Sequence, residues 1–499
     1  MVGNIYKNNY QKDAIAIKFN KKTVTYEELD KIVCQYAGRL TKLGLKPGQK
    51  VILSCPNSPE FIYSYLSVVK NAGIIIPTNI QQTLEEIAYF IQDTQANFII
   101  LHPTVKLKYP DEFFQTHNIK AIILDEEFKQ AVEEEPFEEE PLTEADAKQL
   151  SDDKQTLSTF LYTSGTTGKQ KAAMLTHKNL LTNAEQCRLA FQTRASDNHL
   201  CVLPMFLVFG FTTCVLNPLW SGSAITILEK FQPKEVVDTL LNEGITVFMG
   251  VPSMYILLLE TCKKNNIVFP NLRLGVSGGA ALPVEVINQA KEILKLSIME
   301  GYGLTEACPV ICFNPLDGVR KDGSIGLPIP YAKCKIADEN GVEVATGEVG
   351  ELLAQGDNVM LGYLNREQET AETLKDGWLH TGDLAYADEE GYIFIVDRKK
   401  DMVITGGLNV YPREVEEVLY QYPKIKETAV VGIGNKLRGE YVKAFIVLKE
   451  GEECTRKELV KYLRDHIAGY KVPREFQFIN ELPKNSAGKI LKRVLQEKV

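Results

Sequence analysis

Long hydrophobic runs are missing from this sequence. Apolar runs such as Ile74–Pro77 and Phe98–Leu101 have the length of a strand and are far too short to cross a bilayer. The first residues also lack a basic segment followed by an apolar one, which is the pattern of a secretory signal. We therefore expect no transmembrane segment and a cytoplasmic location.

Excess basic charge and paired cysteines are absent as well. The formal net charge of -9 excludes a general attraction for nucleic acid or anionic lipid. The ten cysteines are scattered singly, and the nearest pair, Cys308 and Cys312, lacks the CxxC spacing and the further partners of a zinc site. We expect reduced thiols that are buried or half-buried.

Short strand-like runs alternate with helical segments over most of the chain. Strands are predicted at Val51–Ser54, Ala121–Leu124 and Ala224–Leu228, because each is a short, β-rich apolar run. The last of these precedes Glu235–Glu243, whose apolar residues share one face of a helix. This alternation is typical of parallel sheets covered by helices, so the predicted fold class is α/β.

The pattern changes after Asp397–Asp401, where a small α+β domain is predicted. Its strands and helices are expected at Thr428–Gly432, Ala444–Leu448, Arg413–Tyr420 and Arg456–Ile467. The predicted organisation is a large N-terminal domain of stacked α/β layers over residues 1–398 and a C-terminal lid over residues 402–499.

A segment rich in glycine and hydroxyl groups follows the apolar run that ends near residue 162. It contains Thr163, Ser164, Gly165, Thr166, Thr167, Gly168, Lys169 and Lys171. Glycine lets backbone N–H groups approach a phosphate, hydroxyls donate hydrogen bonds and lysines neutralise charge. It is not a Walker A loop, because Lys169 is followed by Gln170 and not by Ser or Thr. The segment predicts a loop that wraps a polyphosphate; a plain Ser/Thr/Gly linker is the alternative.

Further segments extend this pattern along nearly the whole chain. Residues 162–171 resemble the phosphate loop of the adenylate-forming superfamily, which contains acyl-CoA synthetases, firefly luciferase and the adenylation domains of peptide synthetases. Segments that match the superfamily follow one another in the expected order: Thr25–Leu29, Ser277–Ala280, Glu300–Glu306, Gly377–Asp383, Asp397–Asp401 and Pro483–Lys489. The chain is most similar in appearance to fatty-acid–CoA ligases.

The resemblance implies a fold and a reaction. The fold is an N-terminal domain with two parallel-rich sheets and a small β-barrel-like part, a hinge at residues 399–401 and a small mobile C-terminal domain. The reaction uses ATP, Mg²⁺ and CoA: a carboxylic acid and ATP give an acyl-adenylate and pyrophosphate, and the acyl group then passes to CoA with release of AMP.

The matching segments also imply nucleotide and metal ligands. Tyr302 can offer an aromatic face to a purine, and the resemblance places Gly279 and Ala280 beside the adenine and Asp383 and Arg398 at the ribose. The other nucleotide-binding candidates in the same segment as Tyr302 are Glu300, Gly301 and Gly303. The metal candidates are Thr163 and Glu306, and Thr305 supplies a hydroxyl for a phosphate oxygen; one carboxylate suffices because Mg²⁺ takes much of its coordination from phosphate oxygens. Surface ion pairs, a helix cap and ordinary strand-end turns are the alternatives.

Lys489 is the principal catalytic candidate. Displacement of pyrophosphate by a carboxylate brings two anions together, so the transition state needs a positive charge beside the α-phosphate. The resemblance implies that Lys489 supplies this charge, that Lys400 is the hinge residue and that Gly407 lines a channel for the pantetheine of CoA. A solvated lysine and a charged linker residue are the alternatives.

Three positions depart from the superfamily pattern. Relatives have proline at Gln170, glycine at Ala172 and histidine at Leu207. The histidine lies between the nucleotide and acyl pockets in relatives, so its replacement predicts activity with altered acyl selectivity or rate. A Cβ at Ala172 would distort the loop if that position required a positive φ.

The segment Phe206–Leu216 bears on the substrate. It contains no carboxylate to hold a substrate ammonium, which favours an uncharged acyl tail. The candidate tail-lining residues are Phe206, Leu207, Phe209, Phe211 and Val310, with plain core as the alternative. A medium- or long-chain fatty acid is the predicted substrate. An aryl acid, a separate acyl carrier protein in place of CoA, and an impaired nucleotide-binding regulator are the alternatives.

Overall fold

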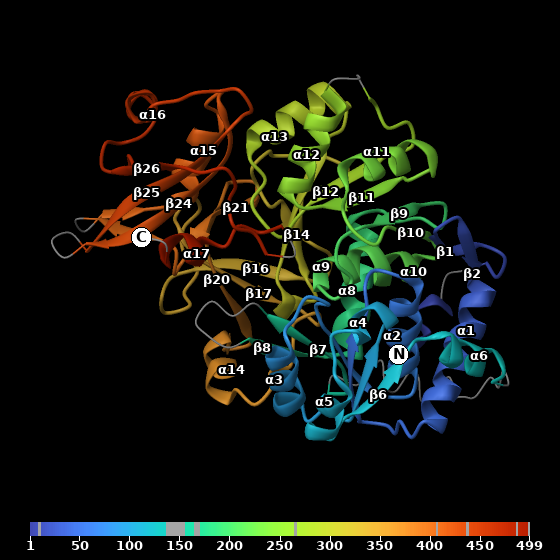
Figure 1. Ribbon diagram of the computed structural model, residues 1–499. Coiled ribbons are helices and arrows are strands. Elements are labelled where there is room, and N and C mark those ends of the chain that lie inside the picture. Colours follow the sequence, from blue (N-terminus) through green and yellow to red (C-terminus); the bar gives the residue numbers. More distant parts are fainter. Residues whose placement is uncertain are drawn as a thin grey trace.

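The computed structural model describes residues 1–7, 11–135, 155–163, 170–263, 267–405, 408–435, 439–485 and 488–497. Four sheets account for its strands. Two large sheets lie in the N-terminal part, a smaller antiparallel sheet follows them, and the fourth belongs to the C-terminal part, coloured orange to red in Figure 1.

The first large sheet has seven described strands. Its order is β18 (Gly362–Tyr363), β8 (Lys171–Thr176), β7 (Leu157–Thr163), β4 (Ile74–Pro77), β3 (Lys50–Ser54), β5 (Phe98–Leu101) and β6 (Lys120–Ile123). Strands β3 to β7 run parallel, and β8 and β18 pair antiparallel at one edge.

The second large sheet has nine described strands. Its order is β15 (Leu327–Pro328), β14 (Val310–Phe313), β13 (Ile298–Gly303), β12 (Leu274–Ser277), β11 (Val247–Gly250), β9 (Asn198–Cys201), β10 (Ala224–Ile227), β1 (Ile15–Phe19) and β2 (Lys22–Thr25). The six strands from β13 to β1 are parallel, which confirms the predicted fold class.

Helices form layers between and outside these two sheets. The central layer buries apolar residues against both sheets and contains η1 (Val2–Lys7), α1 (Tyr26–Lys42), α2 (Pro59–Lys70), α6 (Glu126–Glu133), α8 (His177–Ala190), α9 (Val208–Phe211), η2 (Thr212–Leu216) and α10 (Asn217–Ser221). The free face of the seven-stranded sheet is covered by α3 (Leu84–Thr94), α4 (Pro103–Lys106) and α5 (Asp111–Thr116). The free face of the nine-stranded sheet is covered by α11 (Pro233–Asn242), α12 (Pro252–Lys263), α13 (Val284–Gln289) and η3 (Ala290–Leu294).

A curled antiparallel sheet packs beside β14. Its strands are β16 (Lys333–Ala337), β17 (Gly350–Gln355), β20 (Trp378–Ala387), β19 (Leu374–Lys375) and β21 (Ile393–Arg398). A short helix, α14 (Glu367–Thr373), lies between β18 and β19, and another, η4 (Thr305–Ala307), lies between β13 and β14. This sheet is the predicted barrel-like part, and it shares a buried core with β14.

The C-terminal part has its own sheet and its own core. The strands are β23 (Leu408–Val410), β22 (Val403–Thr405), β25 (Gly439–Leu448), β24 (Ile425–Asn435) and β26 (Glu475–Phe478). The helices are α15 (Pro412–Tyr420), α16 (Arg456–Arg464) and α17 (Lys492–Glu497). Helices α15 and α16 pack on one face and α17 on the other, as expected for the predicted α+β unit.

The sequence sets several helix starts directly. The hydroxyl of Thr25 accepts a hydrogen bond from the backbone N–H of Glu28, and the carboxylate of Glu28 accepts one from the backbone N–H of Thr25. This reciprocal cap satisfies two backbone donors that a helix start leaves open, and it fixes where α1 begins. Thr455 and Glu458 cap α16 in the same way.

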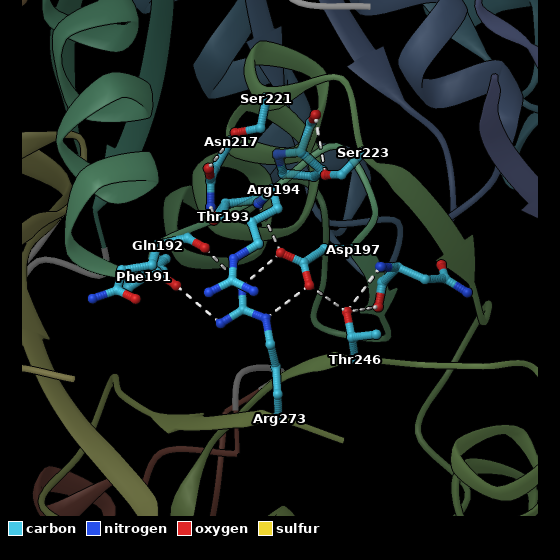
Figure 2. Close-up of polar contacts among 12 residues, drawn as sticks. Phe191, Gln192, Thr193, Arg194, Asp197, Asn217, Ser221, Ser223, Thr246 and Arg273 are labelled. Carbon is cyan, nitrogen blue, oxygen red and sulfur yellow. Dashed lines mark hydrogen bonds and ion pairs between the residues drawn. The ribbon is translucent and has the colours of Figure 1, made fainter. Parts of the chain in front are cut away.

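A polar network closes the amino ends of the parallel strands in the nine-stranded sheet (Figure 2). Asp197 precedes β9, Thr246 precedes β11 and Arg273 precedes β12. The Asp197 carboxylate accepts hydrogen bonds from Nε and Nη2 of Arg273 at 2.8 and 2.6 Å, and from Oγ1 of Thr246 at 2.8 Å. The network ties three strand starts together.

All ten cysteines are free, and eight of them are buried, as predicted. Within the described ranges, no helix has both the length and the apolar character that crossing a bilayer requires.

Candidate active site

Several of the predicted site residues lie at the carboxyl ends of the parallel strands in the nine-stranded sheet. Gly279 follows β12, Tyr302 lies at the end of β13, and Val251 follows β11. In open α/β sheets, ligands bind outside the carboxyl ends of the strands because loops and helix starts converge there. The Asp197 network lies at the opposite, amino ends of these strands (Figure 2).

A cavity of about 70 Å³ lies at the carboxyl ends of these strands. It is lined by Leu203, Pro204, Leu207, Phe209, Gly210, Val251, Gly279, Ala280 and Lys489. The folding of the chain therefore brings acyl candidates (Leu207, Phe209), adenine candidates (Gly279, Ala280) and the catalytic candidate Lys489 to one small space.

Two glycines make this arrangement sterically possible. A Cβ on Gly278 would lie 3.0 Å from the ring of Phe209, so the absence of a side chain lets the ring close over the strand end. Gly488 has φ +76°, and a Cβ there would lie 2.8 Å from Oγ of Ser253. The tip that carries Lys489 can thus approach the start of α12 only because glycine precedes the lysine.

Lys489 is held at this tip by local hydrogen bonds. Its backbone N–H donates to Oδ1 of Asn485 at 2.9 Å. Burial lowers the pKa of the Lys489 ammonium to about 8, with further lowering by Arg398 and a partial offset from Asp383. Lys489 therefore keeps its positive charge at neutral pH and loses it as the pH rises above about 8.

Asp383 and Arg398, the predicted ribose residues, lie side by side. They are register partners on β20 and β21, and Nε of Arg398 is 3.2 Å from Oδ1 of Asp383. The phenol of Tyr302 donates a hydrogen bond of 2.5 Å to Oδ2 of Asp383. Burial and the charge of Asp383 raise the pKa of Tyr302, so the phenol remains a donor. The sequence marked Tyr302 as an aromatic surface but gave no sign of this contact.

Glu306, the metal candidate, lies in η4. The phenol of Tyr363 donates to Oε1 of Glu306 at 2.6 Å, and Nζ of Lys171 lies 5.1 Å from the centre of the Tyr363 ring. Thr305 begins η4, two residues after Gly303, where a Cβ would lie 2.1 Å from the carbonyl oxygen of Pro309. Gly303 thus permits the turn that presents Thr305 and Glu306.

The metal candidates form an incomplete ligand set. No group of three or more His, Cys, Asp or Glu residues that could hold a metal occurs in the part of the chain that the structure describes. Glu306 and Thr163 offer one carboxylate and one hydroxyl, which are hard oxygen ligands. This donor set fits Mg²⁺, which takes its remaining ligands from water and phosphate oxygens.

Several predicted residues lie outside the described ranges. They are Ser164, Gly165, Thr166, Thr167, Gly168, Lys169 and Gly407. The residues flanking the first six are described: Thr163 ends β7 and pairs in register with Lys171 of β8, and the Thr163 hydroxyl lies 3.4 Å from the Lys171 carbonyl oxygen.

The expected strain at Ala172 is not present. Ala172 is fully buried in β8 opposite Tyr162, and its φ is not positive. The position needs no left-handed backbone, because the chain has already entered the strand there. At the neighbouring Gln170, the carbonyl oxygen accepts a hydrogen bond of 2.9 Å from the phenol of Tyr89.

The remaining candidates lie away from the 70 Å³ cavity. Val310 is buried in β14, with its backbone bonded to the side chain of Asn183. Phe211 belongs to the central core, and the partly buried Phe206 packs against it. Lys400 is exposed and follows β21, and its role as a hinge residue stays a prediction.

Glu300 and Gly301 also lie on β13, but Glu300 faces a different cavity. Its carboxylate is buried, with Oε1 3.2 Å from the backbone nitrogen of Leu282 and 3.9 Å from Nη2 of Arg413. The cavity that it lines has a volume of about 140 Å³. The role of Glu300 in nucleotide binding stays a prediction.

The chain matches two family models. Residues 6–364 match the AMP-binding enzyme family, and residues 414–489 match the AMP-binding enzyme C-terminal domain. Among curated proteins, a long-chain-fatty-acid–CoA ligase of Bacillus subtilis is 37% identical over 97% of this chain and 92% of its own length. A feruloyl-CoA synthase of Amycolatopsis is 32% identical over 96% of this chain and 94% of its own length.

Solved structures show the same fold over the whole chain. The ATP-bound form of MatB from Rhodopseudomonas palustris has a TM-score of 0.92 at 29% identity, covering 100% of this chain and 99% of that one. The apo form of the same protein has a TM-score of 0.83, covering 100% and 98%. The chain thus belongs to the AMP-binding, adenylate-forming enzymes, and within them it is a ligase of the AMP-forming acyl-CoA synthetase family.

Proposed function

We propose that the protein is an ATP-dependent ligase that joins a medium- or long-chain fatty acid to CoA. The observation that carries this proposal is the 70 Å³ cavity, in which apolar Leu207 and Phe209 meet Lys489 and the Gly279–Ala280 turn. An acid whose tail points to the apolar wall would place its carboxylate near the lysine. The similarity to the fatty-acid–CoA ligase of Bacillus subtilis supports the same substrate class.

The first step is adenylation. Lys489 would offset the negative charge that gathers as the acid attacks the α-phosphate, and its lowered pKa still leaves it charged at neutral pH. Thr163 and Glu306 would hold Mg²⁺, which when bound neutralises phosphate charge. Asp383, fixed by Arg398 and Tyr302, would accept hydrogen bonds from the ribose hydroxyls.

The position of Lys489 supports assigning this structure to the adenylation step. The fold is more similar to the ATP-bound form of MatB than to its apo form. For the second step we propose a hinge at residues 399–401 between domains at 1–398 and 402–499. Lys400 would allow the C-terminal domain to turn, and Gly407 would line the path of the CoA thiol.

The size of the cavity constrains the acyl group. A cavity of about 70 Å³ is smaller than the engineered cavity of about 150 Å³ that admits benzene. The tail of a fatty acid and the ring of an aryl acid would therefore both require the ring of Phe209 to move away from Gly278. An aryl acid is the second candidate, favoured by the ring that already lines the cavity and by the feruloyl-CoA synthase relative.

Acid-dependent exchange between pyrophosphate and ATP tests the first step. A panel of short, medium and long fatty acids, with ferulate and benzoate, should give exchange that is greatest for a medium or long chain. Exchange with aryl acids alone would replace the proposed substrate, and no exchange with any acid would remove the proposed function.

The acceptor is tested in the same preparation. Thioester should form with free CoA and not with a phosphopantetheinylated carrier protein. Replacing Gly407 with a bulky residue should slow thioester formation while leaving pyrophosphate exchange unchanged. An unaffected second step would remove Gly407 from the CoA path.

A further inference from the structure

Glu300 is a buried carboxylate that the proposed mechanism does not use. It is 4% exposed, and its Oε2 has no hydrogen-bond partner within the described ranges of the chain. The cation closest to it among the recorded ion pairs is Arg413, whose Nη2 lies 3.9 Å from Oε1. Such a charge is costly to bury, so its retention beside a single arginine calls for a reason.

Arg413 belongs to the C-terminal part but reaches into the N-terminal part. It lies in the first turn of α15, and its backbone N–H donates to Oδ2 of Asp397 at 2.9 Å. Its Nη1 donates to the carbonyl oxygen of Ile395 in β21 at 2.9 Å. Its Nε is 3.8 Å from Oε1 of Glu417 on the same helix. The guanidinium therefore joins α15 to β21 and, through Glu300, to β13.

Another ion pair between the two parts is exposed. Nζ of Lys426 in β24 lies 2.9 Å from Oε1 of Glu260 in α12, and the two side chains are 30% and 48% exposed. Exposed pairs of this kind contribute little because water screens them. Arg413 and Glu300 are 13% and 4% exposed, so their attraction is screened much less.

These contacts point to a role that rests on the proposed function. We propose that Glu300 is a positioning residue: through Arg413 it holds the C-terminal part in the arrangement that places Lys489 in the active-site cavity. Glu300 touches neither that cavity nor Lys489, and it acts from the strand that also carries Tyr302.

The charge of Glu300 responds to pH near neutrality. Burial raises the pKa of its carboxyl to about 7, Arg413 and the Leu282 N–H partly offset this, and Glu417 and Asp322 add to it. Charged groups that line the 140 Å³ cavity with it are Lys291, Arg320, Lys321 and Asp322. Several of them are partly exposed, so protons can reach the carboxylate through this cavity.

The direction of the pH effect follows from the raised pKa. Above about pH 7 Glu300 is charged and attracts Arg413; below it the carboxyl is neutral and the attraction is lost. Lys489 loses its charge above about pH 8. Adenylation should therefore be fastest between these two values, with Glu300 setting the acid limb.

Global stability should show the opposite sign. A carboxyl whose pKa is raised on folding binds more protons in the native state than in the unfolded state, so its contribution to stability improves as the pH falls. Glu300→Gln should thus leave Tm unchanged or higher at alkaline pH while it weakens positioning. If Glu300 only stabilised the fold, its substitution would lower Tm and activity together.

The test compares Glu300→Gln with Glu260→Gln, the matched change in the exposed pair. Glu300→Gln should reduce pyrophosphate–ATP exchange about tenfold and remove the acid limb of its pH profile. Acylation of Lys489 by an amine-reactive reagent, measured by mass spectrometry, should become faster in this variant. The reason is that Glu300 and Arg413 no longer hold the C-terminal part in place. Glu260→Gln should change neither measurement.

A second variant protects the test against misfolding. Arg413→Lys keeps the charge but loses the reach of the guanidinium fork, and it should show the same faster labelling. The double variant Glu300→Gln/Arg413→Lys should be no worse than either single one. Wild-type labelling of Lys489 and an unchanged acid limb in Glu300→Gln would overturn the proposal. Loss of exchange in every form, wild type included, would count against the proposed function, while the labelling would still decide the positioning role.

Discussion

Two Asp–Arg pairs lie near opposite ends of the parallel strands in the nine-stranded sheet, and the two pairs differ. Asp197 and Arg273 directly precede strands of this sheet, whereas Asp383 and Arg398 lie on β20 and β21 of the antiparallel sheet and contact Tyr302 at the end of β13. At the amino end, Asp197 accepts four hydrogen bonds, from two nitrogens of Arg273, Oγ1 of Thr246 and the backbone N–H of Arg194 (Figure 2). At the carboxyl end, Asp383 has Arg398 at 3.2 Å and the phenol of Tyr302 at 2.5 Å.

The difference lies in how many acceptor positions of each carboxylate the protein itself uses. A carboxylate has about four lone-pair positions, and those of Asp197 are all used by the protein. Asp383 has side-chain contacts from Arg398 and Tyr302 and so keeps acceptor capacity. We infer that the amino end contributes to folding and the carboxyl end to binding and catalysis.

The largest expected effect is at the carboxyl end. Lys489→Ala should reduce pyrophosphate–ATP exchange on the order of a hundred- to thousandfold, because it removes a charge needed only in the transition state. The variant should keep its Tm, and it should still transfer the acyl group from pre-made acyl-adenylate to CoA. Equal loss of both steps would contradict the assigned role.

The amino end should respond in stability instead. Asp197→Asn leaves Arg273 without its anion and should lower the free energy of unfolding by about 3 kcal/mol, measured by urea titration. The KM for ATP should not change. A raised KM with unchanged stability would mean that the two ends had been assigned the wrong way round.

The pH dependence of unfolding sharpens the same comparison. Burial works to raise the pKa of Asp197, but the hydrogen bonds from Arg273, Arg194 and Thr246 outweigh it, and the net pKa is lowered. The stabilisation by Asp197 is therefore fully present at pH values above the ordinary pKa of an aspartate. It is lost as the pH falls through the lowered pKa of the folded protein. Asp197→Asn should flatten this acid loss, followed by Tm against pH.

Local pattern predicted most of the fold. The periodicity of apolar residues predicted β3, β10 and α11 within a few residues of their observed bounds. This is possible because hydrophobic periodicity and helix caps are local features of the chain. The direction of the strands also followed, since helical segments between strands impose parallel connections.

The contacts within the site could not be predicted in the same way. Tyr302 and Asp383 are 81 positions apart, and Glu300 lies in β13 whereas Arg413 lies in α15. No local pattern in a single sequence reveals which of many polar side chains will be in contact across such separations. Ala172 shows a related limit, because the family pattern raised the question of a positive φ and only the structure shows that β8 does not require one there.

Asp383→Asn is the matched partner of Asp197→Asn. Replacing one acceptor oxygen with a donor should weaken a ribose hydrogen bond and raise the KM for ATP about tenfold, the loss expected for one charge-assisted hydrogen bond. Tm should stay within the range of a surface substitution. A large fall in Tm without a change in KM would show that Asp383 is structural, like Asp197.

The smallest effect is expected at Leu207, where the chain departs from its superfamily. Leu207 lines the cavity together with Phe209 and Lys489, so Leu207→His would introduce the residue that the superfamily pattern leads us to expect there and add a polar group to an apolar wall. We expect a change of about fivefold in kcat/KM, about 1 kcal/mol, and a shift in preference toward shorter or more polar acids. Leu207→Met, which changes shape without polarity, is the control and should keep the preference of the wild type. If both variants shift the preference equally, shape and not polarity at this position sets selectivity, and the departure would be a matter of packing alone.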